Sequence, residues 1–193
     1  MRAPVGRDSF TSRASGSLLA SQRAPTFNKI WNVSQTAFAV PPGGSRSRGK
    51  VASSGKISVK VSGKDNAGAF AVLEVATEVD AGSPLHVHHI ENEWFYALEG
   101  EYDIQVGDQV YHLKPGASVY GPKLIPHAWH DVGATAGKML VVVQPAGNIE
   151  AFSEDLEKLS AGENRNDPGA FKALFEKHDM EIVGPPLPKK LVR

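Results

Sequence analysis

The stretch HVHHIENE, residues 86–93, places three histidines and two glutamates within eight positions. Side chains two residues apart on a strand point to the same face, so His86 and His88 are expected on one side of the chain. Two imidazoles placed in this way can bind one metal ion. Glu93 follows a short turn at residues 90–92, and a reversal of the chain there would bring its carboxylate back toward the same ion. The stretch therefore predicts part of a metal site.

A third imidazole is expected from a later strand. His127 follows Pro126, which restrains the approach of the backbone, and it opens an expected strand at 127–131. Three imidazoles and one carboxylate suit a divalent transition metal, namely Fe, Mn, Ni, Co, Cu or Zn, and the sequence does not choose among these metals. Taken alone, each side chain is as often structural or solvated, so the joint spacing carries the prediction. Glu91 is the rival to Glu93, because the geometry of the turn decides which carboxylate reaches the ion.

This spacing resembles the two sequence motifs of the cupin superfamily. The first motif is G-x5-H-x-H-x3,4-E-x6-G, and its two His, its Glu and its closing Gly stand at His86, His88, Glu93 and Gly100. The second motif is G-x5-P-x-G-x2-H-x3-N, and its first Gly, its Pro and its His stand at Gly116, Pro122 and His127. The resemblance implies that one metal ion is held by His86, His88, Glu93 and His127.

Three positions depart from these motifs. Asp80 stands where the first motif has its leading Gly, Leu124 where the second has its inner Gly, and Asp131 where the second closes with Asn. None of the three is a metal ligand in the family. The departure at Leu124 leaves open the shape of the turn that leads into His127.

Short strands fill the middle of the chain. Apolar and polar residues alternate in short runs between turn signals such as Glu99-Gly100 and Gly107-Asp108, a pattern typical of an all-β sandwich or barrel. The expected strands cover residues 57–61, 69–79, 85–89, 94–98, 102–106, 109–113, 118–120, 127–131 and 138–144. Together with the resemblance, they predict an antiparallel jelly-roll β-barrel of the cupin type at residues 51–147.

The apolar period changes to that of helices after residue 147. Two stripes with spacings of three or four residues stand at Ile149, Phe152, Leu156 and Leu159, and at Phe171, Leu174 and Phe175. Asn148 is the expected N-cap of the first helix, and Asp167 followed by Pro168 predicts the start of the second. We therefore expect residues 148–193 to form a short helical extension, whose stripes pack against the barrel or a second subunit.

The chain begins with a basic segment. Residues 1–50 hold eight basic side chains and one acidic side chain, with little apolar periodicity. This composition predicts a flexible N-terminal segment, either a disordered tail or an organellar transit peptide, in which residues 27–33 can form one short docked element. A cytoplasmic location is favoured, with organellar import as the alternative.

Composition also limits the partners. Lys plus Arg and Asp plus Glu both number 21, so no overall charge would attract nucleic acid. No apolar run is long enough to span a membrane. The absence of cysteine excludes disulfides and thiolate metal sites. The expected partners are a small-molecule substrate and a second copy of the chain in a C2 homodimer, which is the default symmetric assembly.

Three further histidines are expected outside the site. His89 should face away from His86 and His88 on a regular strand. His112 and His178 are expected to be exposed and structural.

The resemblance implies a function that the residues around the ligands support. Phe95 lies two residues after Glu93 and Trp129 two after His127, so both aromatics are expected to line an apolar pocket above the metal. Such a site resembles the quercetin 2,3-dioxygenase type of cupin, which implies a dioxygenase acting on a small enol or flavonol-like aromatic substrate, with Glu93 as ligand and catalytic proton acceptor. The alternatives are a non-catalytic metallocupin that binds a small molecule and a metal-dependent isomerase.

Overall fold

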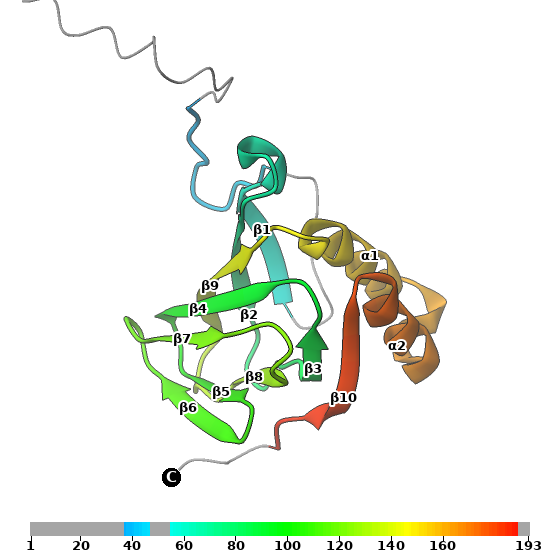
Figure 1. Ribbon diagram of the computed structural model, residues 1–193. Coiled ribbons are helices and arrows are strands. Elements are labelled where there is room, and N and C mark those ends of the chain that lie inside the picture. Colours follow the sequence, from blue (N-terminus) through cyan, green and yellow to red (C-terminus); the bar gives the residue numbers. More distant parts are fainter. Residues whose placement is uncertain (1–36, 47–54, 189–193) are drawn as a thin grey trace, which may run out of the picture. The chain divides into compact units, whose positions relative to one another are not determined.

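The computed structural model describes residues 37–46 and 55–188, which contain two five-stranded antiparallel sheets and two α-helices (Figure 1). The first sheet consists, in spatial order, of β1 (Gly55–Val61), β2 (Ala71–Thr77), β9 (Gly137–Gln144), β4 (Asn92–Glu99) and β7 (Ser118–Gly121). The second consists of β10 (Met180–Pro186), β3 (Pro84–His88), β8 (His127–Asp131), β5 (Tyr102–Val106) and β6 (Gln109–Leu113). The helices are α1 (Ile149–Ala161) and α2 (Pro168–Lys177), with single 3-10 turns at η2 (Gly63–Asn66) and η3 (Glu163–Asn166).

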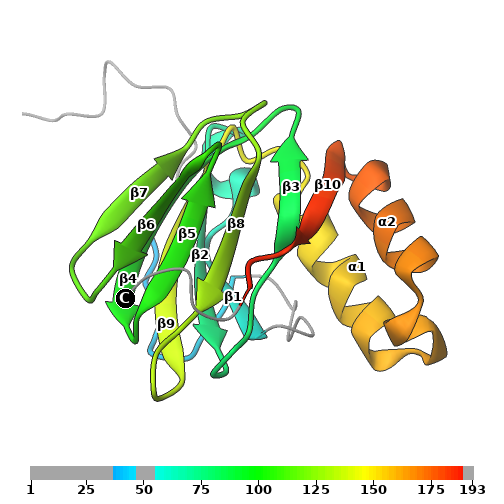
Figure 2. The same cartoon turned by 90° about the horizontal axis from the view of Figure 1, so that it is seen from below.

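The hydrophobic core lies between the two sheets, which face one another (Figure 2). In the first sheet, β2 and β9 bury every second side chain, including Leu73 and Val141. Tyr102 and Ile104 of β5 close the core from the second sheet and are fully buried. Burying one such apolar side chain contributes about 1.5–3 kcal/mol. The alternation of apolar and polar residues thus fixes which face of each strand points inward.

The closed barrel expected from the sequence is not confirmed. The described strands pair only within their own sheet, so the observed architecture is two open sheets packed face to face. The mostly β, antiparallel arrangement is as predicted. All nine expected strands are present, and their ends differ from the predicted bounds by at most two residues.

A tenth strand, β10, was not predicted. It pairs antiparallel with β3, the strand that carries His86 and His88, and it forms the edge of the second sheet. Pro185 and Pro186 lie at its end, which an edge strand tolerates because its outer side needs no ladder hydrogen bonds. The strand was not predicted because these prolines indicate, in the sequence, only the end of regular structure.

Both expected helices are present beside β10 (Figure 2). Asp167 caps α2 by accepting a hydrogen bond from the Gly169 N–H at 2.8 Å, and Pro168 is the first helical residue, as predicted. Asn148 stands at the N-cap of α1 as predicted, but its side chain makes no capping bond and instead donates to Asp179 at 2.8 Å. In the described part of the chain, no helix is long and apolar enough to cross a membrane.

Part of the predicted N-terminal segment contacts β1. The Val59 N–H donates to Ser45 Oγ at 2.9 Å, Lys60 Nζ donates to the Gly44 carbonyl at 3.0 Å, and Arg46 forms an ion pair with Asp65. Residues 44–46 therefore bind to the first sheet. Residues 1–36 and 47–54, with the expected element at 27–33, lie outside the described residues, so the predicted flexibility of that part stays a prediction.

Candidate metal centre

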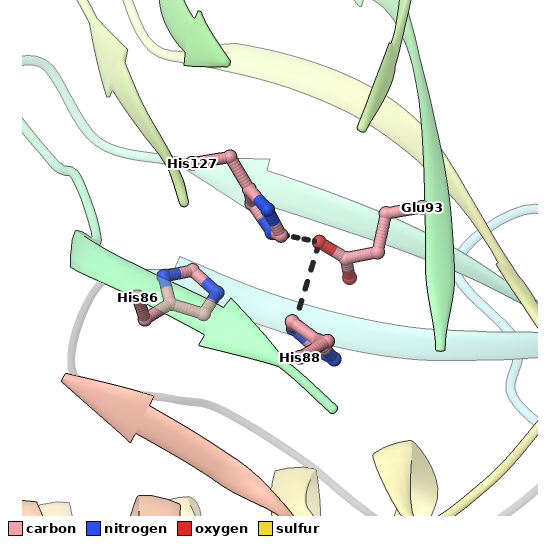
Figure 3. Close-up of side chains that lie close together, drawn as sticks. All are labelled: His86, His88, Glu93 and His127. Atoms are coloured by element: carbon pink, nitrogen blue, oxygen red, sulfur yellow. Dashed lines mark hydrogen bonds and ion pairs between the residues drawn. The ribbon is translucent and has the colours of Figure 1, made fainter. Parts of the chain in front are cut away.

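Four side chains from three strands converge at one point between the sheets (Figure 3). His86 and His88 lie on β3 and His127 is the first residue of β8, so the second sheet supplies all three imidazoles. Glu93 is the second residue of β4 and approaches from the first sheet. All four are buried, and one potential ligand atom of each lies within 4.8 Å of the others. The structure therefore brings together the four residues that the sequence indicated.

The three imidazoles are oriented by hydrogen bonds on their far side. His86 Nδ1 lies 2.8 Å from the Pro84 carbonyl and His127 Nδ1 lies 3.1 Å from the Ile125 carbonyl. A carbonyl oxygen can only accept, so each Nδ1 carries the hydrogen and donates. The third imidazole, His88, has its Nδ1 3.2 Å from Glu91 Oε2. Such partners turn Nε2 of each ring toward the centre, which is the arrangement typical of metal-binding histidines.

Glu93 lies among the inward-facing nitrogens. Its Oε2 is 2.9 Å from His127 Nε2 and 3.8 Å from His88 Nε2 (Figure 3). Burial alone would raise the pKa of the Glu93 carboxyl, but the attraction of His88, His127 and His86 lowers it to about 2. The carboxylate is therefore ionised at neutral pH, as a ligand must be.

Burial and repulsion keep His86 neutral. Burial opposes its charged form, the neighbouring His127 and His88 repel a further positive charge, and together they lower its pKa to about 3. For His88, burial also opposes the charged form, but Glu93 and Glu91 outweigh it and raise the pKa. A neutral imidazole beside an ionised carboxylate is the protonation state that favours a cation. The donor types, the orientation of the rings and these charges together fit a divalent transition metal.

Glu91, the rival carboxylate, lies outside the cluster. It is 1 % exposed, and the turn directs it behind His88 rather than into the centre. Its Oε2 contacts His88 Nδ1, while its Oε1 accepts a hydrogen bond from the Asn148 N–H at 3.0 Å. The turn at 90–92 thus separates two neighbouring carboxylates into one that reaches the centre and one that supports a ligand.

A cavity of about 120 Å³ adjoins the cluster, and His86, His88 and Glu93 form part of its wall. Phe95 and Trp129 line it, as the sequence indicated. The rest of the wall is largely apolar and includes residues of both helices: Ile149, Phe152, Leu156, Phe171 and Phe175. Sequence reasoning assigned these helical stripes to packing alone. Their three- and four-residue spacing identified the buried face of each helix but gave no sign that it faces the metal ligands.

The remaining histidines lie apart from the centre. His89 is exposed and His112 is partly exposed between Asp103 and Glu101, in agreement with the sequence. The expectation for His178 was wrong, because it is only 5 % exposed. Its Nε2 lies 3.0 Å from Asp155 on α1, and its ring packs against the ring of Phe152, so the turn after α2 is held against α1.

Two of the three departures from the motifs share a backbone conformation. Asp80 and Leu124, which replace motif glycines, adopt φ angles of 65° and 67° in the left-handed region that glycine favours. The Leu124 side chain is 59 % exposed, so the turn keeps its shape without burying the leucine. Its N–H donates to the His88 carbonyl at 2.9 Å, which ties this turn to the metal-binding strand.

The central part of the chain matches one known protein family. Residues 73–143, from β2 to β9, match the family described as "Cupin domain". No curated protein sequence matches the chain significantly.

Several solved structures are similar at low identity. An RmlC-like cupin from Shewanella frigidimarina is 18% identical over 50% of this chain and 80% of its own, with a TM-score of 0.43. KdgF from a Halomonas species is 12% identical over 60% of this chain and 99% of its own, with a TM-score of 0.49. A predicted oxalate decarboxylase from Thermotoga maritima is 20% identical over 47% of this chain and 79% of its own, with a TM-score of 0.44.

Proposed function

From the cupin domain at residues 73–143, we propose that the protein is a metal-dependent dioxygenase of small enols. His86, His88, Glu93 and His127 would hold one divalent transition metal ion. The observation that carries the proposal is the position of this buried cluster in the wall of an apolar cavity. A purely structural metal would need no such adjoining space.

The metal would favour the enolate form of the substrate. When bound, it would supply Lewis acidity that stabilises an enolate, and most of the metals that suit these ligands also have redox chemistry. Glu93 is the one carboxylate among the described residues of the cavity wall, and it is ionised. It is therefore the group placed to accept the proton that an enol gives up on binding.

The charge of the cavity wall limits the substrate class. Among the described residues that line it, none is Lys or Arg. A phosphate or carboxylate group on the substrate would therefore enter an apolar space that has no cationic side chain to pair with it, which is unfavourable. This favours an uncharged molecule that becomes an anion only at its enol oxygen.

The size of the cavity limits the substrate further. At about 120 Å³ it is smaller than the apolar cavity of about 150 Å³ that accommodates benzene. A small β-dicarbonyl compound is of this size, whereas a three-ring flavonol is much larger. Of the two substrate types that the sequence suggested, the small enol fits the cavity better. Phe95 and Trp129 would then pack against it and exclude water.

Oxygen consumption tests the proposal. Protein loaded separately with Fe, Mn, Ni, Co, Cu or Zn would be offered small β-dicarbonyls and flavonols while O2 uptake is followed. We expect uptake with at least one redox metal and a β-dicarbonyl, and none with Zn. Glu93→Gln should lose most of this turnover, whereas Glu101→Gln, which changes a partly exposed carboxylate outside the cluster and the cavity wall, should keep it. A thermal shift with ligand but no uptake with any metal would favour the non-catalytic metallocupin.

A further inference from the structure

We propose that Glu91 is a positioning residue that couples metal binding at His88 to the placement of helix α1, which forms a wall of the cavity. The proposal rests on the proposed function only in requiring that the four-residue cluster bind a metal ion. It assigns a role to a buried carboxylate that neither holds the ion nor contacts the cavity.

Glu91 makes one polar contact with each of its carboxylate oxygens. Oε2 lies 3.2 Å from His88 Nδ1, and Oε1 accepts a hydrogen bond from the Asn148 N–H at 3.0 Å. The side chain is 1 % exposed, so water does not compete for either contact. A buried carboxylate with two such partners fixes their separation.

The second contact leads to the cavity wall. Asn148 is the N-cap of α1, and its carbonyl accepts the first hydrogen bond of the helix, from the Phe152 N–H at 2.8 Å. Phe152 is buried and lines the cavity. Three consecutive hydrogen bonds therefore connect the ring of His88 to an aromatic side chain that a bound substrate would meet.

Metal binding acts on the hydrogen bond between His88 Nδ1 and Glu91 Oε2. Coordination through Nε2 requires that the hydrogen of a neutral His88 reside on Nδ1, where it points at Glu91. It also makes that N–H a stronger donor. In the metal-free protein, Nε2 lies 3.8 Å from Glu93 Oε2, which is beyond hydrogen-bond distance, so only the contact with Glu91 orients the ring. A metal held at Nε2 would fix the ring from the other side, and Glu91 would pass that constraint to the start of α1.

Gly147 provides the space that this arrangement needs. Its φ of 49° lies in the left-handed region, and a Cβ built on it would come 1.9 Å from Glu91 Oε1. Any larger residue would displace the carboxylate from the start of α1. Position 147 therefore offers a second way to break the link without altering Glu91 or a metal ligand.

The test measures metal affinity and helix protection separately, with Co(II) as the probe. Affinity is followed by the visible absorption of Co(II), and protection by hydrogen exchange of the amides at residues 148–153, with and without Co(II). Glu91→Gln keeps an oxygen for the Asn148 N–H but offers His88 an amide that cannot replace the carboxylate. We expect its Kd for Co(II) to rise about ten- to a hundredfold. At saturating Co(II), it should also lose the increase in protection that the metal gives the wild-type protein.

The matched control is Glu150→Gln, which changes a carboxylate in the first turn of α1 that is not part of the link. Glu150 Oε1 accepts from Ser62 Oγ at 2.9 Å and from the Gly63 N–H at 2.8 Å, so it also anchors the start of α1 but touches no metal ligand. This variant should lose protection equally with and without Co(II), and its Kd should stay within about twofold of wild type. Gly147→Ala breaks the link at Asn148 instead of at His88, and it should likewise remove the increase in protection that Co(II) gives the wild-type protein.

Two results would overturn the coupling. One is wild-type Co(II) affinity and a wild-type increase in protection in Glu91→Gln. The other is an equal loss of protection in both metal states, which would make Glu91 a structural residue only. Neither readout depends on turnover, so failure to consume O2 would reject the proposed reaction while leaving the coupling standing.

Discussion

His86 and His127 lie directly opposite each other in the ladder between β3 and β8, with ring centroids 4.6 Å apart. Two of the four candidate ligands are therefore set by backbone pairing rather than by loops. Sites built on paired strands hold their side chains more precisely than sites on loops. The centre should accordingly be formed before the ion arrives.

Replacing His86 and His88 together by Ala should abolish stoichiometric metal binding. The remaining His127 and Glu93 offer two ligand atoms, which is too few for a tightly held ion. Metal analysis of the purified variant checks this, with circular dichroism to show that the β-rich fold is kept. The double variant His89→Ala and His112→Ala, which changes two histidines outside the cluster, should bind as much metal as the wild-type protein. Unchanged metal content in the first variant would reject the assignment.

Acid should destabilise the metal-free protein through His86 and Glu93. His86 has a folded pKa of about 3 against an ordinary 6.5, so below pH 6.5 the unfolded chain takes up a proton that the folded chain refuses. Glu93, at about 2 against 4.5, contributes stability that is present above pH 4.5 and lost as the pH falls toward 2. The raised pKa of His88 acts in the opposite sense, stabilising the fold below 6.5 and losing that effect as the pH rises.

Thermal unfolding of metal-stripped protein from pH 7 down to pH 4 measures the balance. The midpoint should fall with pH, and His86→Gln should flatten the decline because one of the two acid-sensitive groups is gone. A steeper decline in that variant would contradict the assignment of a neutral buried His86. Metal affinity should fall over the same range, since protons compete with the ion for the imidazoles.

Leu124→Gly should stabilise the protein modestly. A non-glycine residue in the left-handed region is strained by about 1–2 kcal/mol, and glycine relieves this strain but makes the unfolded chain more flexible by about 0.4–1 kcal/mol. The free energy of unfolding should therefore rise by up to about 1.6 kcal/mol in urea denaturation. The neighbouring Lys123→Gly, which gains flexibility without relieving strain, should lower it. A loss of stability in Leu124→Gly would show that the leucine side chain contributes more than its exposure indicates.

Phe171→Ala should widen the cavity. Phe171 lines it from α2 and packs on Phe175 with ring centroids 5.2 Å apart, but it is only partly buried, so the fold should tolerate the change. We expect an aryl-substituted β-dicarbonyl to bind at least tenfold more tightly than to the wild-type protein, as measured by calorimetry. Tyr111→Ala, which removes an exposed aromatic of β6, should leave this affinity unchanged.

The sequence predicted the strands well because their side chains alternate between a buried face and a solvent-exposed face. Leu73 and Val75 in β2 show this directly, with the partly exposed Glu74 between them. The spacing from His86 to Glu93 likewise indicated the cluster. The pairing of strands was not readable in this way, and neither the openness of the two sheets nor the place of β10 could be predicted, because both depend on contacts between distant parts of the chain.

Strand periodicity alone could not choose between Glu91 and Glu93, and only the resemblance to the cupin motif favoured Glu93. Both carboxylates lie on the same side of an ideal strand, and only the turn at 90–92 separates them. His178 escaped prediction for a related reason. A polar side chain near a helix end is usually exposed, and its burial here follows from Asp155, a partner supplied by the other helix.

The position of β10 bears on how the protein is made. This last described strand covers the outer edge of β3, yet all four candidate ligands precede α1 in the chain. On a ribosome, the ligand set is therefore complete well before the strand that shields it emerges. Until then β3 presents unpaired backbone groups along its edge, a template for pairing with another nascent chain. A translation product that stops before residue 180 would thus carry every ligand and still be prone to aggregate.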